Sequence, residues 1–99
     1  MKLVLVVGAN GFLGSALVDK LLSQEYEVVA VYNSSFDKIN KKAKILTKEE
    51  LFDSNIQPDT VFYLSGNYAV PHEKLLVLND DLYKYSLRFP NSKMVYISS

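Results

Sequence analysis

Three of the four glycines in this 99-residue sequence lie in one stretch, Gly8-Ala9-Asn10-Gly11-Phe12-Leu13-Gly14, directly after the apolar run Leu3–Val7. A glycine turn between a buried strand and a helix can bind the pyrophosphate of a dinucleotide. The first glycine permits the tight turn, the second lets phosphates approach the backbone, and the third lets the helix pack closely. The helix N-terminus adds unpaired N–H groups and a positive dipole end. The stretch therefore predicts a dinucleotide site, with a plain strand-to-helix turn as the alternative.

The remaining glycine, Gly66, follows a second apolar run, Val61–Leu64. In a doubly wound sheet of strand order 3-2-1-4-5, the first and fourth strands are neighbours at the topological switch point, where ligands bind. We therefore expect Ser65 and Gly66 to flank a bound cofactor opposite the first glycine turn.

The elements that must position these residues alternate between strands and helices along the whole chain. This alternation predicts one α/β domain over residues 1–99, with a parallel sheet and right-handed crossovers. Leu13, Leu17 and Leu21 recur every four residues and, with Ala16, are expected to face the sheet from a helix. The expected strands are residues 1–7, 28–32, 43–46, 61–64 and 94–97, and the expected helices are residues 12–24, 48–55 and 76–89.

Composition excludes several function classes. Eleven basic and eleven acidic side chains cancel, so no global field attracts nucleic acid or an anionic membrane. The sequence has no cysteine and one histidine, which excludes disulfides and argues against a structural zinc site. The first apolar run is too short for a membrane span or a signal segment. We therefore expect no metal, no nucleic-acid or membrane partner, and a cytoplasmic location.

Four landmarks in order resemble the extended short-chain dehydrogenase/reductases, the family of nucleotide-sugar epimerases, dehydratases and reductases. Residues 8–14 follow its G-x-x-G-x-x-G loop, and residues 59–66, Asp-Thr-Val-Phe-Tyr-Leu-Ser-Gly, are similar to its fourth strand, D-x-V-F-H-L-A-A. Asn79 matches an asparagine at the start of the next helix, where it could also serve only as a helix cap. Residues 95–99 resemble the strand that delivers the catalytic hydroxyl, which implies Ser99 as that residue and Ser98 as the weaker candidate.

The resemblance implies a Rossmann-like doubly wound sheet, of which this sequence supplies the first five strands. It also implies NAD(P)-dependent chemistry on a nucleotide sugar. Gly8, Gly11 and Gly14 would hold the pyrophosphate, together with Asn10 and the backbone N–H groups of Phe12 and Leu13. The family's reaction uses a Tyr-x-x-x-Lys pair, but none of the seven tyrosines here has a lysine four residues on. We therefore expect the cofactor-binding part of a longer enzyme, inactive by itself.

Asn33 stands where an acidic residue, about twenty positions beyond the glycine loop, normally binds the ribose hydroxyls of NAD. An asparagine can still hydrogen-bond a hydroxyl and does not repel a 2′-phosphate. Lys38, Lys41 and Lys42 follow nearby. The sequence therefore favours NADP slightly and leaves NAD open.

Two rival interpretations remain open at this stage. The chain could be a stand-alone, non-catalytic dinucleotide-binding module, or part of a reductase of the same family that acts on a non-sugar carbonyl. Because the edge of the fifth strand would be unpaired, we also expect a homo-oligomer or marginal stability.

Overall fold

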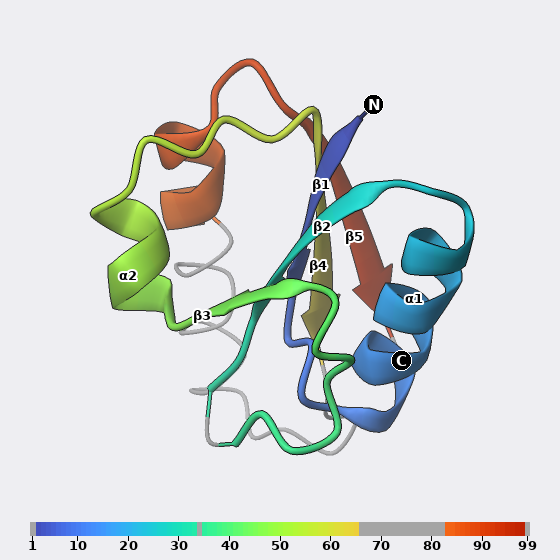
Figure 1. The fold of residues 1–99 in the computed structure, drawn as a ribbon. Helices are drawn as coiled ribbons and strands as arrows, with labels where there is room; N and C mark the ends of the chain where they lie inside the picture. Colours follow the sequence, from blue (N-terminus) through green and yellow to red (C-terminus); the bar gives the residue numbers. More distant parts are fainter. Residues whose placement is uncertain (1, 34, 66–82, 99) are drawn as a thin grey trace.

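The computed structural model describes residues 2–33, 35–65 and 83–98, and of Ser65 and Ser98 only the backbone. Its centre is a parallel sheet of five strands in the order β3-β2-β1-β4-β5, as predicted (Figure 1). The chain enters the sheet in the middle and builds outward, first to one side and then to the other. The strands are β1 (Leu3–Val7), β2 (Glu27–Val31), β3 (Lys44–Leu46), β4 (Thr60–Ser65) and β5 (Lys93–Ser98).

The strand register brings the carboxyl ends of the central strands to one edge. Val7, the last residue of β1, pairs with Val31 of β2 and with Tyr63 of β4. Ser65 and Ser98 are partners at the ends of β4 and β5. The carboxyl ends of β1, β2, β4 and β5 therefore lie at the same edge of the sheet, where a doubly wound fold binds its ligand.

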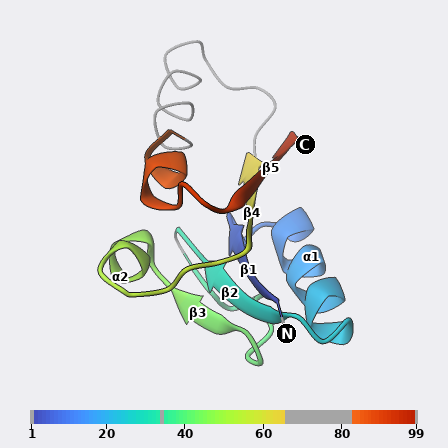
Figure 2. The same ribbon diagram turned by 90° about the horizontal axis from the view of Figure 1, so that it is seen from above.

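Helices cover both faces of the sheet (Figure 2). Helix α1 (Phe12–Ser23) lies on one face, while α2 (Lys48–Phe52) and the helical residues 83–88 lie on the other. Side chains alternate between the faces, because successive residues of a strand point to opposite sides. Val4, Val6 and Ala30 belong to the cluster under α1, whereas Leu5, Val7 and Val29 belong to the opposite cluster. The nearly continuous apolar strands are explained by this burial on both faces.

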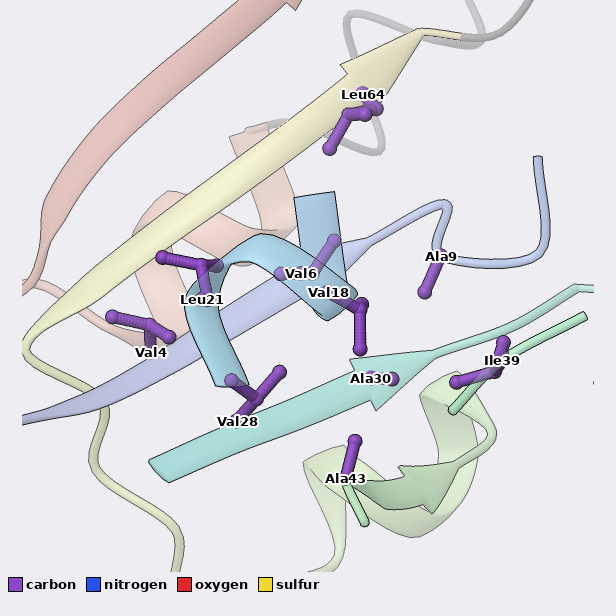
Figure 3. Close-up of a cluster of buried hydrophobic side chains, with 10 residues drawn as sticks. All are labelled: Val4, Val6, Ala9, Val18, Leu21, Val28, Ala30, Ile39, Ala43 and Leu64. Carbon is purple, nitrogen blue, oxygen red and sulfur yellow. The ribbon is translucent and has the colours of Figure 1, made fainter. Parts of the chain in front are cut away.

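The face that α1 turns to the sheet matches the predicted one only in part, with Leu21 buried and Leu17 partly buried against the same cluster. Gly14, Val18 and Leu21 are its buried residues, whereas Ala16 is exposed and the Leu13 side chain is 44% exposed. A step of four residues overshoots the helical turn of 3.6, so a row of residues spaced by four drifts around the helix. Leu21 therefore reaches the core shown in Figure 3, while Leu13, two steps earlier, does not.

Between β2 and β3, residues 35–43 pack in part on the α1 face. Ile39 and Ala43 pack into the cluster under α1, beside Ala30 (Figure 3). The Asn40 side-chain amide donates a hydrogen bond to the Asp19 carboxylate of α1, with an N–O distance of 3.2 Å. The loop is thus anchored by burial and by a polar contact.

A capping box opens α2, as the spacing of Thr47 and Glu50, three residues apart in the sequence, indicates. The Glu50 amide donates to the Thr47 hydroxyl, and the Thr47 amide donates to the Glu50 carboxylate at 2.9 Å. The helix itself is shorter than expected and ends at Phe52. In the third expected helix, residues 83–88 are helical, and the side chains of Tyr85 and Phe89 are buried. Its first part falls outside the described residues.

Within the described ranges, no helix combines the length and the apolar character that crossing a bilayer requires.

Candidate functional site

The candidate site is built on the turn between β1 and α1. The amides of Gly8 and Ala9 both donate to the Val31 carbonyl, at 3.1 and 3.0 Å, and so tie the turn to the end of β2. The Gly11 amide donates to the Gly8 carbonyl at 3.3 Å and closes the turn. Asn10, half buried, lies between them. These bonds direct the first turn of α1 over the carboxyl edge of the sheet (Figure 1).

Packing within the protein explains two of the three glycines. Gly8 has a φ of +84°, in the left-handed region, and a Cβ there would lie 2.8 Å from the Leu64 carbonyl oxygen. A Cβ on Gly14 would lie 2.2 Å from the Gly8 carbonyl oxygen and 2.8 Å from the Ala9 Cα. Both positions therefore require glycine whether or not a ligand binds.

Gly11 has no such explanation within the described chain. Its φ of −79° and ψ of 169° suit any residue. A Cβ would meet only the Gly8 carbonyl oxygen, at an ordinary contact distance of 3.7 Å, and the residue is exposed. Neither the backbone conformation nor the packing requires glycine here. The missing side chain instead leaves the backbone open to close approach from solvent.

The N-terminus of α1 has the character of an anion site. Gly11 is its N-cap and offers no side-chain hydrogen bond, and the first turn carries no acidic residue. The Ser15 amide bonds back to the Gly11 carbonyl at 2.9 Å, so the amides of Phe12, Leu13 and Gly14 come before the helical ladder begins. Such amides, at the positive end of the helix dipole, bind phosphate well.

On the β2 side, the chain leaves the sheet through Tyr32 and Asn33. Asn33 is exposed two residues beyond Val31, the residue whose carbonyl holds the glycine turn. It therefore lies at the same edge as the turn. Lys38, Lys41 and Lys42 are exposed farther along the same loop.

Sequence reasoning missed an aromatic pair in this loop. The rings of Tyr32 and Phe36 meet edge to face, with centroids 5.2 Å apart. Phe36 is 52% exposed. The available signal was two aromatic residues four positions apart, directly beyond the second strand.

On the other side of β1 from β2, strands β4 and β5 also end at the carboxyl edge of the sheet. The backbones of Ser65 and Ser98 are paired there. Gly66, Asn79 and Ser99 lie outside the described residues, so the structure does not place these predicted site residues. Among the described residues there is no cluster of side chains that could hold a metal ion.

Comparison with known proteins gives a consistent result. The model of the "NAD dependent epimerase/dehydratase family" matches residues 4–99. A search of the curated proteins gave no match. Among solved structures, the chain is similar to a UDP-galactose 4-epimerase, with 27% identity, a TM-score of 0.73 and coverage of 98% of this chain and 38% of that one.

Two further solved structures share the fold. One is a UDP-glucose 4-epimerase, at 23% identity and a TM-score of 0.71, with 95% of this chain and 34% of that one covered. The other is a UDP-N-acetylglucosamine 4-epimerase from Bacillus cereus, at 19% identity and a TM-score of 0.70, with 97% and 36% covered. The chain thus spans little more than a third of the length of these proteins.

Proposed function

The chain belongs to the NAD dependent epimerase/dehydratase family, and we propose that residues 1–99 form the NAD(P)-binding domain of an enzyme that acts on a nucleotide sugar. The family implies a nicotinamide dinucleotide as cofactor. The observation that carries the proposal for this chain is Gly11. Neither the backbone conformation nor the packing requires a glycine at this position. The missing side chain leaves the backbone accessible to a ligand beside the N-terminus of α1, which has no side-chain cap.

The residues present fit a dinucleotide. The pyrophosphate would lie against Gly11 and accept hydrogen bonds from the amides of Phe12 and Leu13, with Gly8, Asn10 and Gly14 shaping the turn. Asn33 would donate to or accept from the hydroxyls of the adenosine ribose. Ser65 and Gly66 would flank the cofactor on the β4 side, and Asn79 would contact it from the following helix.

The reaction class follows from the family and from the resemblance to UDP-sugar epimerases. When bound, a nicotinamide supplies hydride transfer, and the protein binds and orients the reacting groups. Ser99 would hydrogen-bond the substrate hydroxyl or carbonyl in the complete enzyme. A serine alone does not supply an activated proton donor, so this chain would bind cofactor without turning over substrate. Epimerisation, dehydration and keto reduction all fit this division of roles.

Cofactor choice depends on the end of β2. An exposed amide at Asn33 carries no charge to repel a 2′-phosphate, and Lys38, Lys41 and Lys42 add positive charge to the same loop. We therefore favour NADP slightly over NAD.

Substitution at Gly11 tests the proposal. An alanine there adds a methyl group in the space assigned to the pyrophosphate, so Gly11→Ala should abolish binding of NAD and NADP in calorimetric titrations. Stability should change by less than about 1 kcal/mol, because the weaker N-cap is offset by lower entropy of the unfolded chain. Ala16→Ser, an equally small change at an exposed position of the same helix, is the matched control. Equal affinities of the wild type and Gly11→Ala would refute the assignment.

We also propose that residues 1–99, taken by themselves, form a homo-oligomer or are only marginally stable. In the described part of the chain, β5 pairs only with β4, and its outer edge is a template for another strand. Sedimentation at increasing concentration should show a dimer or a larger assembly, and a stable monomer throughout would contradict this. The cytoplasmic location, and the absence of nucleic-acid and membrane partners, stay predictions.

A further inference from the structure

The aromatic pair beyond β2 leaves one ring available to a ligand. Tyr32 is half buried and packs against the cluster under α1, whereas Phe36 is 52% exposed. The two ring planes meet at 62°. An edge-to-face contact of this kind fixes the orientation of a ring without covering both of its faces.

The surrounding loop holds Phe36 at this position. The Ile39 amide donates to the Phe36 carbonyl at 3.1 Å, and the Ile39 side chain is only 3% exposed. The Tyr32 amide donates to the Leu46 carbonyl of β3 at 3.1 Å. Both ends of the segment are thus attached to the sheet and its core, yet the Phe36 ring is not drawn into that core.

The pair also lies beside the glycine turn. Tyr32 directly follows Val31, whose carbonyl accepts the amides of Gly8 and Ala9. Among the described residues, six large hydrophobic side chains are exposed, and three of them lie at this edge: Phe12 and Leu13 in the first turn of α1, and Phe36 on the loop after β2. Small-molecule sites are lined mostly by apolar and aromatic side chains. Exposed apolar surface therefore gathers where the ligand is expected.

We infer that Phe36, oriented by Tyr32, is the stacking surface for the adenine base of the dinucleotide. This inference rests on the proposed function. With the pyrophosphate at α1 and the ribose at Asn33, the base comes next along the ligand, on the β2 side and away from β4. A flat purine buries the free surface of the Phe36 ring. Stacking needs only a π-face, so it does not discriminate between purines.

Calorimetric titration of ADP-ribose tests the inference. Phe36→Ala should weaken binding about fivefold to tenfold, the lower part of the range for a base stacked on an aromatic ring. Phe36→Tyr, which keeps the ring, should retain wild-type affinity. Leu87→Ala, another exposed apolar position that is 61% exposed on the helical residues 83–88, is the control and should have no effect.

Ligand changes separate stacking from general damage to the site. Phe36→Ala should lower the affinity for the hypoxanthine analogue of ADP-ribose by the same factor, and should leave the affinity for inorganic pyrophosphate unchanged. A loss of pyrophosphate affinity would mean that the substitution disturbs the glycine turn, and would overturn the stacking role.

Contacts in the wild-type complex give a test that needs no variant. Nuclear Overhauser effects should connect the adenine H2 or H8 proton with the Phe36 ring. If the wild type binds ADP-ribose without these contacts, or Phe36→Ala binds it equally well, the inference is wrong while the proposed function stands. If the wild type binds no adenine dinucleotide, the proposed function itself fails.

Discussion

At the residue scale, the three positions of the glycine motif differ in whether the protein itself requires a glycine there. Gly8 and Gly14 are required by the protein itself, through a left-handed φ and through contacts too close for a Cβ. Gly11 is required by neither. The sequence predicts the motif and its strand–turn–helix context, but it cannot tell these glycines apart, because the distances depend on how α1 packs against β1 and β4.

This difference predicts opposite behaviour for two alanine substitutions. Gly14→Ala should lower the free energy of unfolding by about 2–3 kcal/mol, because its Cβ would be forced against the backbone of Gly8 and Ala9 and would push α1 off the sheet. In Gly11→Ala the new Cβ would have no atom closer than the Gly8 carbonyl oxygen at 3.7 Å, so its free energy of unfolding should stay close to that of the wild type. Urea denaturation of both variants measures this. A Gly14→Ala protein as stable as the wild type would mean that α1 does not pack this closely.

At the element scale, the sequence predicts best those local structures that depend on a few neighbouring residues. The capping box of α2 follows from Thr47 and Glu50 alone, since both partners lie within one turn. The buried face of α1 was predicted less well. Its stripe contains Gly14 and Val18, and a count of leucines does not reveal that a glycine packs at the closest point of contact.

The capping box also predicts a pH dependence. The hydrogen bond from the Thr47 backbone amide, and then the one involving its side chain, lower the pKa of the Glu50 carboxyl below its ordinary value of 4.5. A group whose pKa is lower in the folded state stabilises that state above the unfolded pKa, and the contribution is lost as the pH falls through the folded value. The free energy of unfolding should therefore drop on acidification from about pH 4.5 downward.

Glu50→Gln isolates this effect, because glutamine can complete the capping box but does not titrate. The variant should lose less stability than the wild type over the same acid range. Parallel pH dependences of the two proteins in urea denaturation would show that Glu50 is not bonded to the Thr47 amide in solution.

At the scale of the whole molecule, the sequence predicts the sheet well. Alternating strand and helix patterns, together with right-handed crossovers, leave few strand orders, and the order 3-2-1-4-5 is confirmed. The aromatic pair of Tyr32 and Phe36 was not predicted. Its geometry depends on how the β2–β3 loop folds back onto the core through Ile39, and no periodic pattern encodes that path.

Asp59 provides a test at the opposite edge of the sheet. Its carboxylate accepts from the Leu3 amide at 3.0 Å, its own amide donates to the Leu3 carbonyl at 2.8 Å, and its carbonyl accepts from the Lys93 amide at 2.9 Å. Asp59 thus joins the amino ends of β1, β4 and β5. Asp59→Ala should lower the free energy of unfolding by about 1 kcal/mol, the usual net contribution of one hydrogen bond.

Nucleotide affinity should not change in Asp59→Ala, because the substitution lies at the far edge from the candidate site. Asp59→Asn, which keeps a side-chain acceptor, should recover part of the stability. Weaker ADP-ribose binding by a folded Asp59→Ala protein would contradict a ligand site confined to the carboxyl edge.

The most direct test of the central claim is a titration of the ¹⁵N-labelled protein with NADP, followed through the backbone amide resonances. We expect the largest shifts at Phe12 and Leu13, whose amides would donate to the pyrophosphate, and at Gly11 beside them, with further shifts at Asn33 and Phe36. Saturating NADP and NAD without shifts in the glycine turn, or with the largest shifts at the amino edge of the sheet, would contradict it.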